Sequence, residues 1–269
     1  MRGALAALAV AVLVAAGCGG QAGSSGPTTQ PPPPPPPPPP TTTAPTTTST
    51  EPTDGIELLV YFLSDGKIAT SKRTVPKTTA VATAALTELL EGTDGFEQSL
   101  GFTSAIPAGT TFSNLEIDDG VASLKLPALL PKAAQAQIVY TLTQFSTVQS
   151  VDLGGARAAT RATYEDLTPQ ILVEAPTPGQ TISSPVRIRG TANTFEATFV
   201  VRLLLNAAGA KAFEQPVTAT SGNGTRGTFD VSVPYKVSAS GPGTLVAFEV
   251  SAEDGSEIHR VEIPVNVTP

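Results

Sequence analysis

Residues 135–145 read QAQIVYTLTQF, and this stretch decides the fold of the first half of the chain. On a helical wheel its apolar side chains share one arc of about 120°, which is the width of a single buried stripe. They are Ile138, Val139, Leu142 and Phe145. Pro131 stands just before the stretch and suits a first helical turn. The pattern predicts an amphipathic helix that begins after Pro131.

The polar side of this helix carries Gln137, Thr141 and Gln144 in a narrow line, which we call the polar stripe. Charged side chains are commoner on a free helix face, whereas neutral amides favour buried or contacted positions. Three interpretations stay open. The stripe is a surface for a partner or a small polar ligand, a set of hydrogen bonds to nearby backbone, or a solvated face. We keep it as a candidate partner or ligand surface.

The elements around this helix predict an α+β module over residues 54–153. The apolar run 56–62 (IELLVYF) has the length of a strand and ends at a turn over residues 64–66. Residues 76–92 predict a helix that covers a sheet, with Thr78 or Thr79 as its cap and Gly92 after its last turn.

A hairpin and a last strand complete the predicted module. The stretches 110–117 and 121–126 flank Asp118-Asp119-Gly120, a strong hairpin signal, and 148–153 is the last strand. Helices on one face of the sheet are expected. Residues 154–168 fit a terminal helix, a hairpin or a linker equally well.

Residues 169–269 have the pattern of an all-β domain. Seven short candidate strands are separated by turn signals such as Pro178-Gly179 and Asn223-Gly224. The candidates are QILVEAP, VRIRGTA, ATFVVRLLL, FEQPVTAT, GTFDVSVP, TLVAFEVSAE and HRVEIPVNV. Seven alternating strands in about 100 residues predict an immunoglobulin-like β-sandwich. No cysteine pair crosses it, so apolar packing must hold its core.

The first 53 residues predict an exported and anchored chain. Residues 1–17 have the charge, apolar run and small residues of a lipoprotein signal peptide, and Cys18 follows them. We expect diacylglycerol on Cys18 and attachment to the membrane; an ordinary signal peptide with an incidental cysteine is the alternative. Residues 18–53 include ten consecutive prolines, Pro31–Pro40, and predict a disordered Pro/Thr-rich spacer. The proline run extends about 30 Å as a polyproline helix.

Both folded modules resemble known bacterial families. Residues 54–153 resemble the GerMN domain through VYFLSDG, ALTELLEG, SAIPAGTTFSNLEIDDGVASLKL and QIVYTLTQFSTVQSVDL. Residues 169–269 resemble the Gmad-type immunoglobulin-like domain of spore-germination lipoproteins through APTPGQTISSPVRIRGTANTFEATFVVRLLLNAAG and FEVSAEDG. The resemblance implies extracytoplasmic binding or assembly modules with no established catalytic activity.

The inventory of reactive groups is small. His259 is the only histidine, and Cys18 is the only cysteine. The adjacent acids Asp118-Asp119 and Glu253-Asp254 each precede a glycine, so turn chemistry explains them. No phosphate loop, metal motif or cofactor motif is found. A net charge of −7 disfavours nucleic acid as a partner. We therefore expect no enzyme activity, no metal and no cofactor.

These features predict a lipid-anchored protein on the extracytoplasmic face of the cell membrane. Its expected role is a non-catalytic binding or scaffold module of the cell envelope, of the germination, sporulation or envelope-signalling type. An unidentified envelope protein or wall polymer is its expected partner. A small-ligand or glycan-binding protein is the alternative, favoured if a pocket between the modules encloses the polar stripe. A cell-wall hydrolase is a remote alternative that requires two carboxylates about 5–10 Å apart in a cleft.

Overall fold

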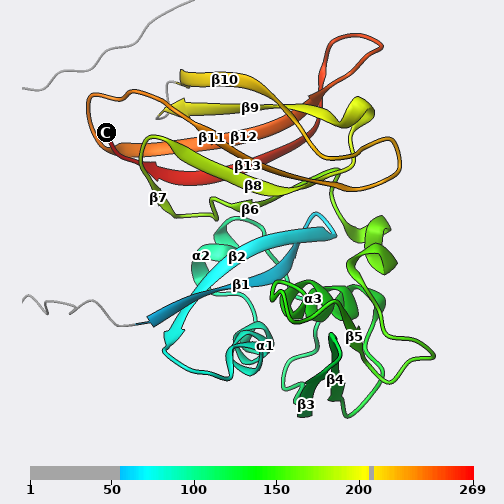
Figure 1. Ribbon diagram of the computed structural model, residues 1–269. Helices are drawn as coiled ribbons and strands as arrows, with labels where there is room; N and C mark the ends of the chain where they lie inside the picture. The colour runs from blue at the N-terminus through cyan, green and yellow to red at the C-terminus, as the bar shows by residue number, and fades with distance from the viewer. Residues whose placement is uncertain (1–54, 206–208) are drawn as a thin grey trace, which may run out of the picture. The chain divides into compact units, whose positions relative to one another are not determined.

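A β-hairpin forms the centre of the first module (Figure 1). The structure is a computed structural model, and it describes residues 55–205 and 209–269. Strand β1 (Gly55–Ser64) pairs antiparallel with β2 (Lys67–Pro76) along its whole length. The two-residue turn Asp65-Gly66 has positive φ at both positions, 50° and 74°, which suits a short polar residue followed by glycine.

Two helices pack on β1 and close the core of this module (Figure 1). They are α1 (Val81–Glu91) and α3 (Lys132–Leu142), which also contact each other. The short helix α2 (Gly95–Ser99) follows α1. The largest enclosed apolar side chains of the hairpin and the two helices are Tyr61, Phe62, Ile68, Leu86, Leu89, Ile138, Tyr140 and Leu142. Each such leucine or isoleucine contributes roughly 1.5–3 kcal/mol on burial. The apolar stripe read from the sequence of α3 is therefore a core face.

A small mixed sheet lies beside the hairpin. Strands β3 (Ser113–Asp118) and β4 (Val121–Lys125) form the predicted hairpin, and β5 (Ser150–Asp152) pairs parallel with β4. The turn residues Asp119 and Gly120 both have positive φ, as an Asp-Gly hairpin requires. The predicted α+β class is confirmed.

Three details of this module differ from the sequence prediction. Strand β2 was not predicted, because its buried positions include Thr70 and Ser71 instead of a continuous apolar run. Helix α2 was missed because it is only five residues long. The cap of α1 was predicted wrongly. Ala80 occupies the cap position, and the Thr78 hydroxyl accepts a hydrogen bond from the Ala80 N–H instead of from the helix.

The segment between the modules is ordered. It contains the 3₁₀ helix η1 (Arg161–Leu167), and Ala159 forms an isolated bridge with Val151 of β5. Tyr164 is buried, and its hydroxyl donates to Gln135 of α3 at 3.0 Å. Residues 154–168 are therefore not a free linker. Their first part turns back to the antiparallel bridge with β5, and their second part is a short helix packed on α3.

The second module is a β-sandwich, as predicted. All seven predicted strands are present, and the two-residue strand β7 (Thr181–Ile182) is added. One sheet has the order β11-β8-β6 and the other the order β10-β9-β12-β13-β7. The strands are β6 (Ile171–Ala175), β8 (Val186–Ala192), β9 (Thr198–Leu205), β10 (Ala210–Thr218), β11 (Gly227–Val233), β12 (Gly241–Val250) and β13 (Glu257–Val267). A single 3₁₀ turn, η2 (Phe195–Ala197), precedes β9.

Gly190 of β8 shows how closely this sandwich is packed. A β-carbon at position 190 would lie 2.0 Å from the Leu172 carbonyl oxygen and 2.8 Å from the Phe229 ring. The Phe229 ring in turn meets Phe199 edge-on at 4.8 Å between ring centroids. Only glycine allows β8 to lie this close to β6, so Gly190 inside this apolar strand has a packing role.

Strand β6 joins the cores of the two modules. Leu172 packs with the apolar cluster of the first module, whereas Ile171 and Val173 pack with the sandwich core. This alternation follows from the two faces of a strand. β6 also contacts β2, and the described residues, 55–205 and 209–269, belong to one compact unit. Across residues 55–205 and 209–269, no helix has the length and hydropathy of a membrane span.

Candidate functional site

The polar stripe of α3 lies inside the first module. Gln137 and Thr141 have no exposed surface. The Gln137 side-chain amide donates to the Tyr61 carbonyl of β1 at 3.1 Å, and its oxygen accepts from the Ala105 N–H at 2.8 Å. Thr141 accepts from the Tyr61 N–H at 3.2 Å. The prediction that Gln137 and Thr141 form a partner or ligand surface is therefore wrong. They supply structural hydrogen bonds to backbone.

Gln144 continues the same pattern one step further along β1. Its amide accepts from the Leu59 N–H at 2.8 Å and donates to the Leu59 carbonyl at 2.6 Å. At the other end of the strand, Leu63 exchanges two backbone hydrogen bonds with Thr103. The outer edge of β1 therefore has partners at residues 59, 61 and 63. The polar stripe replaces a neighbouring strand, which explains neutral amides at these positions.

A partly buried cluster of polar side chains joins the two modules. Arg161 of η1 donates to the Glu174 carboxylate of β6 at 2.7 Å and to the Tyr61 hydroxyl at 3.2 Å. The Tyr61 hydroxyl donates to the same Glu174 oxygen at 2.5 Å. The guanidinium also lies over the rings of Tyr61 and Tyr140, at 5.3 and 4.7 Å from their centroids. One arginine thus contacts β1, α3 and β6 together.

The charges of this cluster stabilise one another. Burial acts to lower the pKa of Arg161, but Tyr61 and Glu174 outweigh that effect and the pKa is raised above its ordinary value. Burial, together with the Glu174 charge, raises the pKa of Tyr61 well above its ordinary value. The phenol therefore remains a hydrogen-bond donor and Arg161 remains charged at every physiological pH.

The other end of η1 is fixed to the sandwich. Glu165 pairs with Arg226 at 2.9 Å and accepts from the Asn193 side chain at 2.9 Å. Arg226 also donates to the Pro169 carbonyl at 2.7 Å. Burial acts to raise the pKa of Glu165, but the bonds from Arg226 and Asn193 outweigh it and the pKa is lowered. We call the segment from Arg161 to Pro169 the clasp, because it binds both modules.

A polar cavity of about 380 Å³ opens beside the clasp. Of the polar stripe only Gln144 lines it, and its floor contains Arg161 and Glu174. The other lining residues are Glu57, Leu59, Tyr61, Lys72, Thr143, Ala175, Thr177, Gln180 and Arg189. A pocket between the modules was expected to favour small-ligand binding if it enclosed the polar stripe. This cavity includes one stripe residue out of three.

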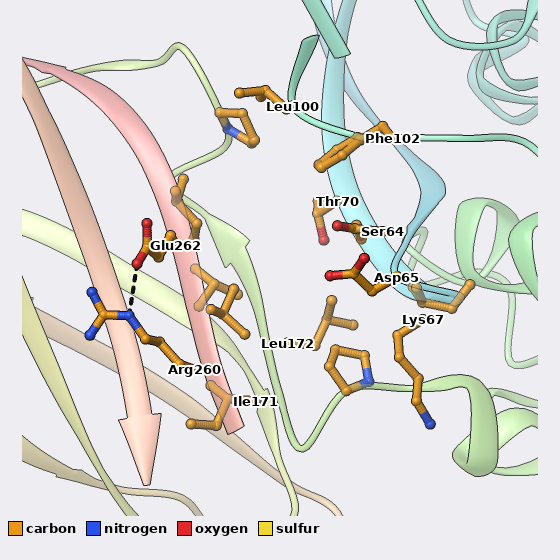
Figure 2. A pocket seen from close by; sticks show the side chains of 17 residues that line it. Ser64, Asp65, Lys67, Thr70, Leu100, Phe102, Ile171, Leu172, Arg260 and Glu262 are labelled. Carbon is orange, nitrogen blue, oxygen red and sulfur yellow. Dashed lines mark hydrogen bonds and ion pairs between the residues drawn. The ribbon is translucent and has the colours of Figure 1, made fainter. Parts of the chain in front are cut away.

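A second cavity of about 480 Å³, which we call the junction cavity, lies between β2 and the sandwich (Figure 2). Ser64, Asp65 and Thr70 lie together on the hairpin side, and Arg260 and Glu262, joined by an ion pair of 2.7 Å, lie across from them. Apolar side chains make up much of the wall, among them Leu100, Phe102 and Leu172. No local pattern predicts this cavity, because its walls come from distant segments, from Ser64 of β1 to Ile263 of β13.

The residues considered for catalysis lie in turns or pair with a neighbouring side chain. His259 is exposed, and its Nδ1 lies 2.9 Å from Glu249. Asp119 sits in the β3–β4 turn, and the Asp254 carboxylate accepts from the Ser256 N–H and hydroxyl in the turn before β13. Within residues 55–205 and 209–269, no group of three or more acids, histidines or cysteines is placed to bind a metal.

The clasp and its partner Glu174 were missed by sequence reasoning, yet one signal was available. Glu174 interrupts the apolar strand ILVEA, and an acid in a core strand calls for a buried partner. The predicted signal peptide, Cys18 and the spacer lie outside the described residues, so lipidation of Cys18 remains a prediction.

An α+β module clasped to an immunoglobulin-like sandwich defines the class of this protein. Comparison with family models identifies both parts. Residues 59–154 match the family described as sporulation and spore germination, and residues 170–256 match the immunoglobulin-like domain of bacterial spore germination. The chain therefore carries a GerMN domain followed by a Gmad-type domain, as the resemblance indicated.

Solved structures and curated sequences add little to this identification. The tandem GerMN domains of the sporulation protein GerM from Bacillus subtilis match with 17% identity and a TM-score of 0.32, over 66% of this chain and 61% of that chain. A candidate lipoprotein from Clostridium perfringens matches with 18% identity and a TM-score of 0.24, over 44% and 83%. This chain thus spans about three fifths of the GerM structure. No curated protein sequence matches.

Proposed function

We propose that this chain is a lipid-anchored, extracytoplasmic binding protein that holds an envelope partner at the junction of its two modules. The observation that carries the proposal is the clasp. A cavity between two modules keeps its shape only if the modules are fixed. Here Arg161, Glu174 and Tyr61 form a partly buried network at that junction. Such a network specifies one arrangement of the groups it joins.

The anchored location is supported by the sequence before residue 54. An apolar run from Ala4 to Ala16 is followed by Gly17, Cys18 and then the proline-rich spacer. An acyl chain contributes about 0.8 kcal/mol per buried CH₂, so two chains on one residue anchor firmly. The proline run would hold the folded unit roughly 30 Å further from the bilayer. This arrangement suits a protein that works by presenting a binding surface.

Reversible cross-linking in cells tests the binding role. Cells that carry the wild-type chain or Cys18→Ser are cross-linked, the chain is recovered under denaturing conditions, and attached molecules are identified by mass spectrometry. The proposal expects an envelope protein or wall polymer to be enriched with the wild type and depleted with Cys18→Ser, because the variant is not held at the membrane. Reproducible recovery of the wild-type chain with nothing attached would overturn it.

The proposed role is non-catalytic. The acids in the clasp region are engaged in ion pairs, Glu174 with Arg161 and Glu165 with Arg226, and the adjacent acids of the sequence sit in turns. Purified residues 19–269 should therefore release no soluble fragments from peptidoglycan during a long incubation. Any turnover above that of a heat-denatured sample would contradict this part of the proposal.

A small-ligand role is the second candidate, and the polar cavity favours it. That cavity combines the exposed guanidinium of Arg189 with the side-chain amides of Gln144 and Gln180. These groups suit a small carboxylate or a polyol. A thermal-shift screen with small carboxylates and sugars, repeated on Arg189→Ala, tests this candidate. A ligand whose stabilising effect disappears in the variant would support it over the partner-binding role.

A further inference from the structure

The junction cavity is walled by the edges of strands. Its lining includes every residue of three runs: Lys67–Thr70 of β2, Ile171–Val173 of β6 and Arg260–Ile263 of β13. Side chains alternate between the two faces of a strand, so a cavity over one face would meet every second residue. A cavity that meets every residue of a run lies along the strand edge, where backbone N–H and C=O groups point outward.

Strand β2 presents unpaired backbone groups at this edge. Tyr61 of β1 directs its N–H and C=O away from β2 and toward α3. In an antiparallel pair, directly opposite residues share this orientation. Thr70 is opposite Tyr61, and Ile68 is opposite Leu63, which bonds outward to Thr103. Ile68 and Thr70 therefore direct their backbone groups away from β1, and within the described residues those groups have no hydrogen-bond partner.

The Thr70 side chain is a second observation at the same place. Thr70 is 5% exposed, and its hydroxyl has no hydrogen-bond partner among the described residues. Buried polar groups are nearly always paired, because leaving one unpaired costs free energy. The two edges of the hairpin thus differ. The edge of β1 is closed by the polar stripe, whereas the edge of β2 ends at a cavity.

We propose that an extended polypeptide segment of the partner enters the junction cavity and adds to the edge of β2 as a third strand. This inference rests on the proposed binding function and defines the chemistry of the partner. Strand addition takes its affinity from backbone hydrogen bonds and its specificity from pockets for alternate side chains. Pairing with Ile68 and Thr70 needs about three residues at roughly 3.3 Å each. The cavity volume of about 480 Å³ falls within the usual range of roughly 300–1,000 Å³ for binding sites.

The walls of the cavity define which side chains the segment carries. Leu100, Phe102 and Pro178 form an apolar wall that suits one aliphatic or aromatic side chain. Asp65 lies on the hairpin side of the cavity (Figure 2) and makes no ion pair with any described residue. The neighbouring Lys67 ammonium donates to the Asp166 carbonyl at 2.6 Å. The Lys67 ammonium is thus directed to that carbonyl and does not pair with Asp65. The Asp65 carboxylate needs a cation, so the segment carries lysine or arginine beside its apolar residue.

Peptide selection tests the inference. A displayed library of short peptides is selected on immobilised residues 19–269, with Thr70→Pro protein as the counter-target, and enriched peptides are titrated. Proline removes the outward N–H of residue 70 and is tolerated at such an edge position. The matched control is Thr74→Pro, because Thr74 has the same outward orientation opposite Glu57 but is exposed and outside the cavity. Thr70→Val is the second variant, which keeps the backbone and removes only the hydroxyl.

The expected result is a set of peptides that pair an apolar residue with a basic one. Thr70→Pro should weaken their binding roughly tenfold, because it removes one backbone hydrogen bond to the peptide. Thr74→Pro should leave the binding unchanged. Peptide binding should also slow hydrogen exchange at the backbone amides of Ile68 and Thr70 in the wild type. In Thr70→Val, it should still slow exchange at the amide of Ile68. Failure to enrich any peptide over the counter-target, or equal binding to both proline variants, overturns the inference.

Two further outcomes separate this inference from the proposed function. If the amides of Ile68 and Thr70 become protected as protein concentration rises without peptide, the segment belongs to a second copy and the partner assignment is wrong. If the partner recovered by cross-linking in cells is still enriched with Thr70→Pro, the strand-addition site is wrong while the binding function stands. Loss of that partner with Thr70→Pro but not with Thr74→Pro supports both.

Discussion

Replacing Arg161 with methionine tests how strongly the clasp joins the modules. The methionine keeps much of the side-chain volume but removes the charge and four donated hydrogen bonds, to Glu174, Tyr61, Tyr140 and Thr143. It leaves the Glu174 carboxylate largely buried without its cation. Removing one partner of a buried ion pair costs about 3–5 kcal/mol.

The structure points to the lower end of that range. The side chains of Arg161 and Glu174 are 24% and 17% exposed, so water partly replaces the lost partner. We expect a loss of about 3 kcal/mol in the free energy of unfolding. For a chain of this size, that loss lowers Tm by about 6–12 °C, since each kcal/mol shifts Tm by roughly 2–4 °C.

The assay is urea denaturation of purified residues 19–269. Arg187→Met is the matched control, because the Arg187–Asp230 pair is 67% and 48% exposed, and such a surface pair contributes little to stability. A double-mutant cycle with Glu174→Gln then isolates the coupling between Arg161 and Glu174. If Arg161→Met costs no more than Arg187→Met, the clasp does not hold the modules and the reasoning is refuted.

Three other perturbations have defined outcomes. Gln137→Ala leaves two buried backbone groups of the first module unpaired, so it should lower the free energy of unfolding by about 2–4 kcal/mol, while partner capture by the folded fraction stays the same; reduced capture at full folding would contradict a packing role. The pKa of Glu165 is lowered in the folded protein. The Glu165–Arg226 pair therefore contributes its full stabilisation above pH 4.5, the ordinary pKa of glutamate, and this stabilisation is lost as the pH falls through the folded pKa. Denaturation curves should therefore show an acid-induced loss below that value that is smaller in Glu165→Gln, and equal curves would argue against the pairing. Cys18→Ser should move the chain from the membrane fraction to the soluble extracytoplasmic fraction, and a variant that stays in the membrane would contradict lipid anchoring.

Much of the fold could be predicted because the decisive patterns are local. The apolar arc of α3 follows from its own helical period, and the sandwich strands follow from alternation between turns. Strand β2 escaped because three of its ten residues are Lys67, Lys72 and Arg73, and because its buried Thr70 and Ser71 are polar. Its place in the fold depends on pairing with β1, which no local pattern records.

The candidate site was less predictable, for a physical reason. A helical wheel separates polar from apolar faces, but it cannot tell water from the backbone edge of a strand. Gln137 and Thr141 therefore resembled a surface although they bond to Tyr61. The clasp was hidden in the same way, because Arg161 and Glu174 meet only when η1 and β6 come together in the folded chain.

Photo-cross-linking in cells is the most direct test of partner binding at the junction. A photoreactive amino acid is placed either at Leu100, which lines the junction cavity, or at Leu129, which is 81% exposed and lies outside that cavity. The account predicts a discrete cross-linked partner from position 100 and no comparable product from position 129. A partner captured equally from both positions, or only from position 129, would contradict it.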